Sequence, residues 1–158
     1  MSLAYIAPAG QHQQLEWIGG QTLEILLDGR VTDGQVMVVR SHLTAGSASP
    51  LHVHHREDEM FVILQGEGVV WVGDDRHDVG AGAAMFLPRD IPHAYHFTSP
   101  TVDFLTICTP SGMEDFFRGA GRDLDAPRPE GWTVTMDALV GAALAGGQEI
   151  LGPPPPLD

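Results

Sequence analysis

The residues best suited to chemistry lie in one short stretch, between Gly46 and Gly66. His52 and His54 are separated by one residue, and on a β-strand residues two apart point to the same face. Glu59 follows at an odd spacing, so the polar run after His54 must turn or bulge for its carboxylate to reach the two imidazoles. Neutral imidazoles and a carboxylate suit a divalent transition metal. The stretch therefore predicts a metal centre.

The candidate for a fourth ligand is His93, which follows a proline-bounded turn over residues 87–92. Each proline fixes its own φ and restricts the residue before it, so His93 is expected on stiff backbone. A catalytic site of this kind would keep at least one position open for water or substrate. The ligand set predicts one divalent ion per chain and does not choose among iron, manganese, nickel, cobalt, copper and zinc.

Aromatic and polar residues near these ligands are candidates for a pocket wall. Tyr95 and Phe97 share the parity of His93 on a predicted strand, and Phe61 follows Glu59 on another. A wall of this kind would suit a flat aromatic substrate, although core packing also explains the aromatic residues.

The strand expected over residues 35–43 leaves two alternatives open. Its alternation puts Arg40 and His42 on one face. If that face points into a barrel, both side chains approach the metal pocket; otherwise both lie on a solvated sheet face. An inward Arg40 would favour an anionic substrate. The other histidines near turns, His55 and His77, are expected to serve solvent-facing or supporting roles.

Short strands separated by turn signals fill the chain up to residue 110, which predicts an all-β sandwich or barrel. Beyond it, helical spacing predicts two short helices, at about 113–120 with Ser111 as N-cap and at about 135–144. The tail from Glu149 to Pro156, which ends in four prolines, should be extended with polyproline character. The chain is thus expected to comprise an N-terminal arm (1–20), a β-barrel (21–110) and a C-terminal extension (111–158).

Composition excludes some partners. The 158 residues are 43% hydrophobic and carry a formal net charge of −13, which argues against nucleic acid and anionic membranes as partners. There is no apolar run long enough for a membrane span and no signal-peptide pattern. The single cysteine, Cys108, is expected to be a buried small hydrophobic residue. One cysteine cannot form an internal disulfide, which favours a reducing, cytoplasmic location.

The spacing of these residues resembles the cupin superfamily. The first cupin motif matches in full, at Gly46, His52, His54, Glu59 and Gly66. The second matches at Gly82, Pro88 and His93, whereas Asp90 replaces the usual glycine and Phe97 the usual asparagine. The resemblance implies a small double-stranded β-helix, or jelly roll, around a metal.

The C-terminal segments are similar to those of single-domain quercetinase-like bacterial cupins, which include flavonol 2,4-dioxygenases. This resemblance implies that His52, His54, Glu59 and His93 hold the metal, and that Glu59 accepts the proton of a flavonol hydroxyl before reaction with O2. Two other functions remain open: metal-dependent isomerisation or decarboxylation of a small organic acid, and non-catalytic binding of a small molecule. A homodimer is expected, from the N-terminal arm, the tail and open sheet edges that need cover.

Overall fold

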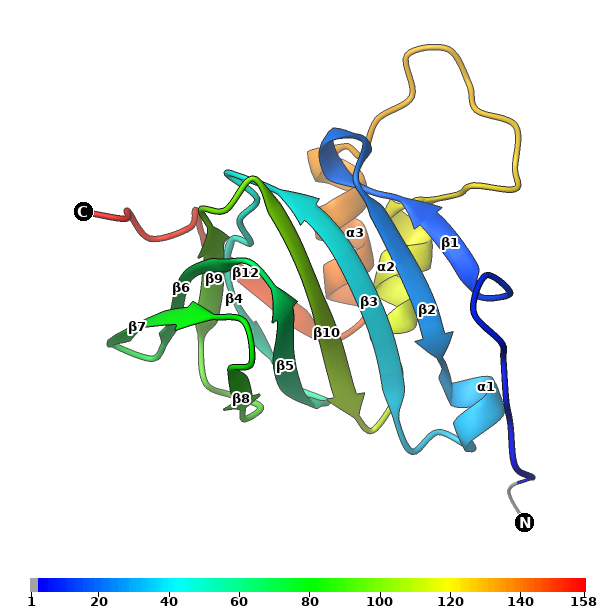
Figure 1. The fold of residues 1–158 in the computed structure, drawn as a ribbon, viewed down its shortest axis with the longest axis horizontal. Helices are drawn as coiled ribbons and strands as arrows, with labels where there is room; N and C mark the ends of the chain where they lie inside the picture. The colour runs from blue at the N-terminus through cyan, green and yellow to red at the C-terminus, as the bar shows by residue number, and fades with distance from the viewer. Residues whose placement is uncertain (1–2) are drawn as a thin grey trace.

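The computed structural model describes residues 3–158, which form two antiparallel sheets, three α-helices and one short 3-10 helix (Figure 1). The elements in chain order are β1 (Gln13–Glu16), η1 (Ile18–Gly20), β2 (Thr22–Leu27), α1 (Gly29–Thr32), β3 (Met37–Thr44), β4 (Leu51–His54), β5 (Asp58–Gln65), β6 (Glu67–Val72), β7 (Asp75–Gly80), β8 (Ala84–Leu87), β9 (His93–Phe97), β10 (Thr101–Thr109), α2 (Glu114–Ala120), β11 (Arg122–Asp123), α3 (Met136–Ala145) and β12 (Gln148–Gly152).

The two sheets exchange strands repeatedly along the chain. The seven-stranded sheet has the order β11-β1-β2-β3-β10-β5-β8, and the five-stranded sheet has the order β12-β4-β9-β6-β7. From β3 to β10 the chain passes back and forth between them, as a double-stranded β-helix requires. The predicted all-β jelly roll with a short helical extension is confirmed.

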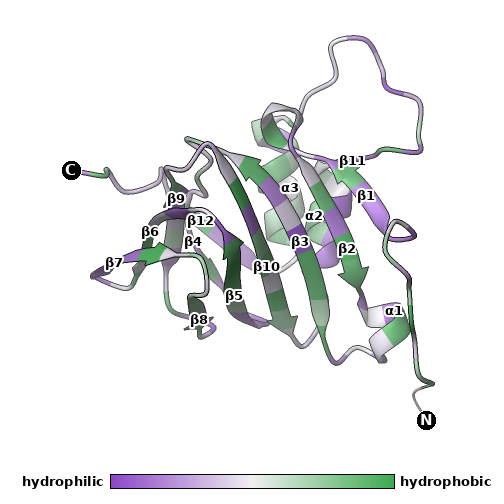
Figure 2. Ribbon diagram, in the orientation of Figure 1, coloured by the Kyte–Doolittle hydropathy of each residue, from purple (hydrophilic) through white to green (hydrophobic). Residues whose placement is uncertain are grey.

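Alternation along the long strands decides what the sheets bury. In β3 the odd-numbered residues from Met37 to Leu43 are buried, and in β10 the even-numbered residues from Val102 to Cys108 are. Figure 2 shows the resulting apolar bands along the strands of the larger sheet. Phe61, Phe97 and Phe104 form part of the core between the sheets.

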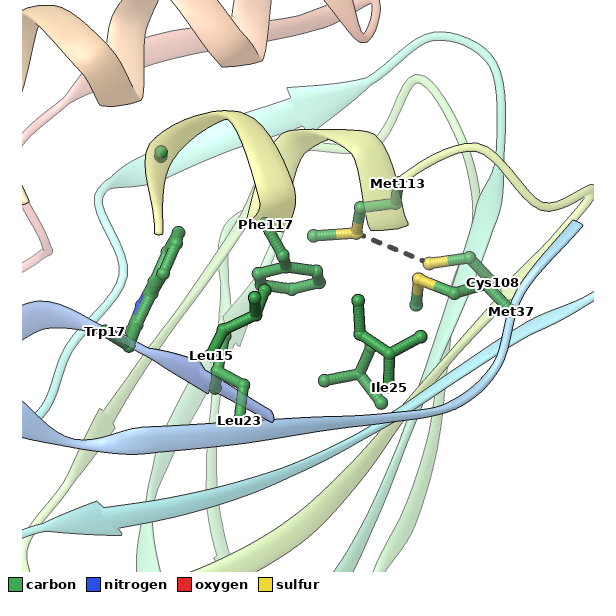
Figure 3. Close-up of a cluster of buried hydrophobic side chains, with 10 residues drawn as sticks. Leu15, Trp17, Leu23, Ile25, Met37, Cys108, Met113 and Phe117 are labelled. Atoms are coloured by element: carbon green, nitrogen blue, oxygen red, sulfur yellow. Dashed lines mark hydrogen bonds between the residues drawn. The ribbon is translucent and has the colours of Figure 1, made fainter. Parts of the chain in front are cut away.

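A second core joins helix α2 to the larger sheet. Trp17 and Phe117 meet edge to face, with ring centroids 5.4 Å apart. Met113 lies beside Cys108, whose Sγ donates to the methionine Sδ over 3.5 Å (Figure 3). Cys108 is fully buried, as predicted from its apolar strand.

The N-terminal segment is more ordered than expected. Gln13–Glu16 forms β1, which pairs with β2 and β11, so the predicted irregular arm ends at about residue 12. The sequence did not predict this strand because two consecutive glutamines, Gln13 and Gln14, break the apolar alternation. Residues 1 and 2 of the predicted arm lie outside the described residues.

The C-terminal extension contains both predicted helices and two strands that were not predicted, β11 and β12. Thr135 caps α3 through the amide of Ala138, whereas the predicted cap of the first helix at Ser111 is wrong. Glu114 instead accepts hydrogen bonds from the backbone amide of Gly112, just before the helix, and from that of Gly29 in α1. The tail pairs with β4 as strand β12. Among residues 3–158, no helix is long and apolar enough to cross a membrane.

Candidate metal centre

Three strands bring the four predicted ligands together. His52 and His54 alternate on β4, and His52 lies directly opposite His93 of β9. The bend at residues 55–57 then takes the chain across to β5 in the other sheet. Glu59 is therefore directed back toward the imidazoles from the opposing sheet, despite its odd spacing.

Each imidazole is oriented by a hydrogen bond from its Nδ1 side. The Nδ1 atoms of His52 and His93 lie 2.8 Å and 3.1 Å from backbone carbonyl oxygens, which can only accept. The Nδ1 atom of His54 lies 3.3 Å from the buried carboxylate of Glu57. Partners of this kind fix the ring orientation of metal-binding histidines and leave Nε2 free for the ion.

The remaining ligand atoms converge in a buried space. One ligand atom from each of His52, His54, Glu59 and His93 lies within 4.8 Å of the others. Glu59 Oε2 is 2.8 Å from His93 Nε2 and 3.4 Å from His54 Nε2. His54 Nε2 is buried without a hydrogen-bond partner, which native interiors rarely tolerate. The donor set and this unpartnered nitrogen fit a divalent transition metal.

Burial and proximity shift the pKa values of this cluster. Burial, with a contribution from His93, lowers the pKa of His52 to about 4. Burial also disfavours charge on His54, but the carboxylates of Glu59 and Glu57 outweigh it and raise its pKa to about 9. Burial raises the pKa of Glu59, yet the charge of His54 and the hydrogen bond with His93 bring it well below its usual range. At neutral pH Glu59 is thus a carboxylate, the form that binds metal.

A cavity of about 700 Å³ extends from this cluster. His52 and Glu59 are exposed to it, and Phe61 and Tyr95 form part of its wall, where sequence analysis placed them. Phe97 does not line it: the ring lies in the core against Tyr95, with centroids 4.9 Å apart.

Arg40 and His42 face away from the cavity. Ser41 and Leu43, on the opposite face of β3, line it instead. Arg40 forms a bidentate ion pair with Asp103, with Nε to Oδ1 at 2.9 Å, and His42 Nε2 lies 2.8 Å from Glu24. Arg40 and His42 therefore lie on the solvated face of the sheet, and the alternative that they approach the metal pocket is wrong.

Part of the cavity wall had no signal in the sequence. It comes from both ends of the chain, which were predicted to be an arm and an extension: Trp17, Ile18, Met113, Phe116, Phe117, Met136, Leu139, Ala143, Gln148 and Ile150. Apolar spacing indicated the helices but not the surface they cover. Only the fold places these segments over the open side of the barrel (Figure 1).

The remaining predicted histidines lie outside the cluster. His55 Nδ1 is 2.6 Å from Asp90, and its Nε2 is 3.4 Å from Glu149, so it joins the turn before β9 to strand β12. Asp90 has φ of 64°, which explains why glycine is usual at this position. His77 is exposed on β7, away from the ligands.

Comparison with known proteins agrees with this geometry. Residues 39–109 match the cupin domain family. This segment is a cupin domain. The chain is 27% identical over 120 residues to quercetin 2,3-dioxygenase from Bacillus subtilis, a match that covers 76% of this chain and 35% of that protein.

Solved structures share the fold of this cupin. KdgF from Halomonas sp. superposes with a TM-score of 0.61 at 18% identity, covering 68% of this chain and 94% of the other. A predicted oxalate decarboxylase from Thermotoga maritima gives 0.58 at 22% identity, covering 67% and 99%. The matched segments span between 35% and 53% of the curated relatives' lengths.

Proposed function

We propose that this cupin is a metal-dependent dioxygenase that cleaves a flavonol, or a related aromatic substrate with an enolic hydroxyl, using O2. The observation that carries the proposal is the position of the four-residue donor set, two of whose members, His52 and Glu59, line a largely apolar cavity of about 700 Å³. Cavities of about 300–1,000 Å³ accommodate small organic molecules. The similarity to a quercetin 2,3-dioxygenase supports the same substrate class.

In this proposal His52, His54, Glu59 and His93 hold the ion. A bound divalent metal would act as a template and Lewis acid for the substrate oxygen atoms. Glu59 is buried and anionic and faces the cavity, so its carboxylate can accept the proton of an enolic hydroxyl. Phe61 and Tyr95 would hold the flat rings and exclude water.

Turnover of a small organic acid is less well supported. The described residues that line the cavity include no arginine or lysine. A carboxylate substrate would therefore find no side-chain counter-charge beyond the metal, and Arg40, the candidate for that role, is paired with Asp103 outside the cavity. Apart from Glu59 and His52 at the metal centre, none of the lining residues within 3–158 carries an acid or base that ionises in the ordinary pH range, which favours a neutral aromatic substrate.

Oxygen uptake tests the proposal directly. The protein is stripped, reloaded separately with each candidate metal, and assayed with a flavonol in an oxygen electrode. We expect metal-dependent uptake that His54→Ala abolishes and His77→Ala leaves unchanged. Saturable flavonol binding without uptake by any metal form would instead indicate a binding protein.

We also propose a homodimer in the cytoplasm. Met136 and Leu144 of α3 and Ile6 of the N-terminal segment are each more than 60% exposed, and burial against a second copy would remove this apolar surface from water. The single buried cysteine is consistent with a reducing compartment. Light scattering that gives the mass of a single chain would contradict the dimer.

A further inference from the structure

One polar side chain in the cavity wall has no assigned role. Gln148, the first residue of β12, is only 5% exposed, lines the cavity, and has no hydrogen-bond partner for its side-chain nitrogen Nε2. A buried amide donor without a partner destabilises the folded protein, a cost that an apolar side chain at this position would avoid. A glutamine here is explained most simply by a polar ligand.

The register of β12 places Gln148 beside the metal centre. Gln148 is directly opposite His54 in the antiparallel pair formed by β12 and β4. Side chains directly opposite in such a pair point to the same face, with Cβ atoms about 5 Å apart. The carboxamide therefore shares the cavity-facing side of the sheet with the imidazole that has its own unpartnered nitrogen.

The backbone around Gln148 is held on both sides. The amide of His55 donates to the carbonyl of Gly147 over 3.1 Å, and the Arg56 guanidinium donates to the carbonyl of Ala145 over 3.2 Å. On the other side, Glu149 contacts His55. These contacts fix the start of β12 against the strand that carries His54, so Gln148 has a defined position relative to the ligands.

We propose that the Gln148 carboxamide donates a hydrogen bond to a carbonyl oxygen of the substrate held at the metal centre, and so selects substrates with a carbonyl next to the metal-binding hydroxyl. Gln148 is thus a positioning and specificity residue. The inference rests on the metal centre of the proposed function, but it does not require the substrate to be a flavonol. It predicts that any small chelator with adjacent hydroxyl and carbonyl groups uses the same donor.

The test measures ligand binding to the Co²⁺-loaded protein from its visible absorption spectrum. Three probes are titrated: maltol, which has adjacent hydroxyl and carbonyl groups; quercetin, a flavonol; and imidazole, which has no oxygen. The variant is Gln148→Met, which keeps the length of the side chain and removes the donor. The matched control is Leu151→Met, on the same strand but 45% exposed.

We expect Gln148→Met to bind maltol and quercetin about 3- to 10-fold more weakly, as the loss of one hydrogen bond predicts, with imidazole affinity and Co²⁺ content unchanged. Equal affinity of the variant and wild type for maltol would overturn the proposal. So would an equal weakening of all three probes, because that indicates a structural role.

Two further outcomes separate this inference from the proposed function. If Gln148→Met binds maltol more weakly than wild type does, but quercetin is neither bound nor turned over, the flavonol proposal fails and the role of Gln148 stands. If quercetin is turned over and maltol binds equally to the variant and wild type, the flavonol proposal stands and the role of Gln148 fails. If Gln148→Met does not retain Co²⁺, Gln148→Asn is used in its place. Its shorter side chain moves the amide away from the ligand, so we expect weaker binding of maltol and unchanged binding of imidazole. Unchanged maltol affinity would contradict the role.

Discussion

At the scale of single residues, the metal ligands could be predicted because their signal is local. The His-x-His pattern fixes two imidazoles on one face wherever the strand lies, and a turn must follow for Glu59 to join them. Arg40 and His42 could not be placed in this way. Alternation groups them on one face of β3, but only packing against α2 and the opposite sheet decides which face is buried.

A supporting residue offers a test at this scale. The Glu57 carboxylate is buried beside His54 Nδ1, so Glu57→Ala removes the group that orients the ring. We expect affinity for Co²⁺, measured by competition with a chelator, to fall about 10- to 100-fold, as for other groups that orient metal-binding histidines.

The control for that measurement is Asp58→Ala, at the neighbouring residue. Its carboxylate pairs with Arg89 at 3.1 Å and not with a ligand. Metal affinity should stay within about twofold of wild type, since an exposed ion pair contributes little. Equal losses in both variants would show that the effect is not specific to His54.

At the scale of elements, the tight connection from β5 to β6 depends on Gly66. Its φ is 98°, and a Cβ there would lie 2.8 Å from the backbone oxygen of Thr101. Gly66→Ala should lower the free energy of unfolding by about 2 kcal/mol or more, through backbone strain and this clash. Gly73→Ala, at a positive φ with open surroundings, should cost only about 1 kcal/mol in the same denaturation measurement. Equal costs would rule out the close approach.

The outer face of β3 and β10 gives a pH-dependent prediction. The hydrogen bond from Arg40 holds the pKa of Asp103 below the usual range of an aspartate. Because the folded-state pKa is depressed, the pair stabilises the protein above about pH 4 and loses this effect as pH falls through the folded-state pKa. Arg40→Leu should therefore lower stability at pH 7 by up to about 1 kcal/mol, and the difference from wild type should shrink below pH 4. A difference that grows on acidification would contradict the assignment.

Elements at the chain ends were harder to predict than those of the barrel. The barrel strands have alternating apolar residues and glycine turns, whereas β1 begins with two glutamines and β12 runs into prolines. Strand β12 pairs with β4, which is distant in the sequence, and β1 pairs with the distant strand β11 as well as with its neighbour β2. Their contribution to the cavity wall is a property of tertiary structure that local pattern does not encode.

At the scale of the whole molecule, the C-terminal extension completes the site. Helix α3 and strand β12 contribute to the cavity wall, and β12 pairs with the strand that carries two ligands (Figure 1). A chain that ends at Gly147 should melt about 5 °C or more below the full chain and release metal faster, whereas a chain that ends at Gly152 keeps β12 and should retain both properties. If the two truncations behave alike, β12 does not support the site.

The central claim is that His52, His54, Glu59 and His93 form one metal centre. The most direct test is the metal content of protein dialysed after loading, measured by elemental analysis for wild type, His54→Ala and His77→Ala, with circular dichroism to confirm folding. We predict about one ion per chain in wild type and His77→Ala and almost none in folded His54→Ala. Full occupancy in His54→Ala, or loss in His77→Ala, would contradict the claim.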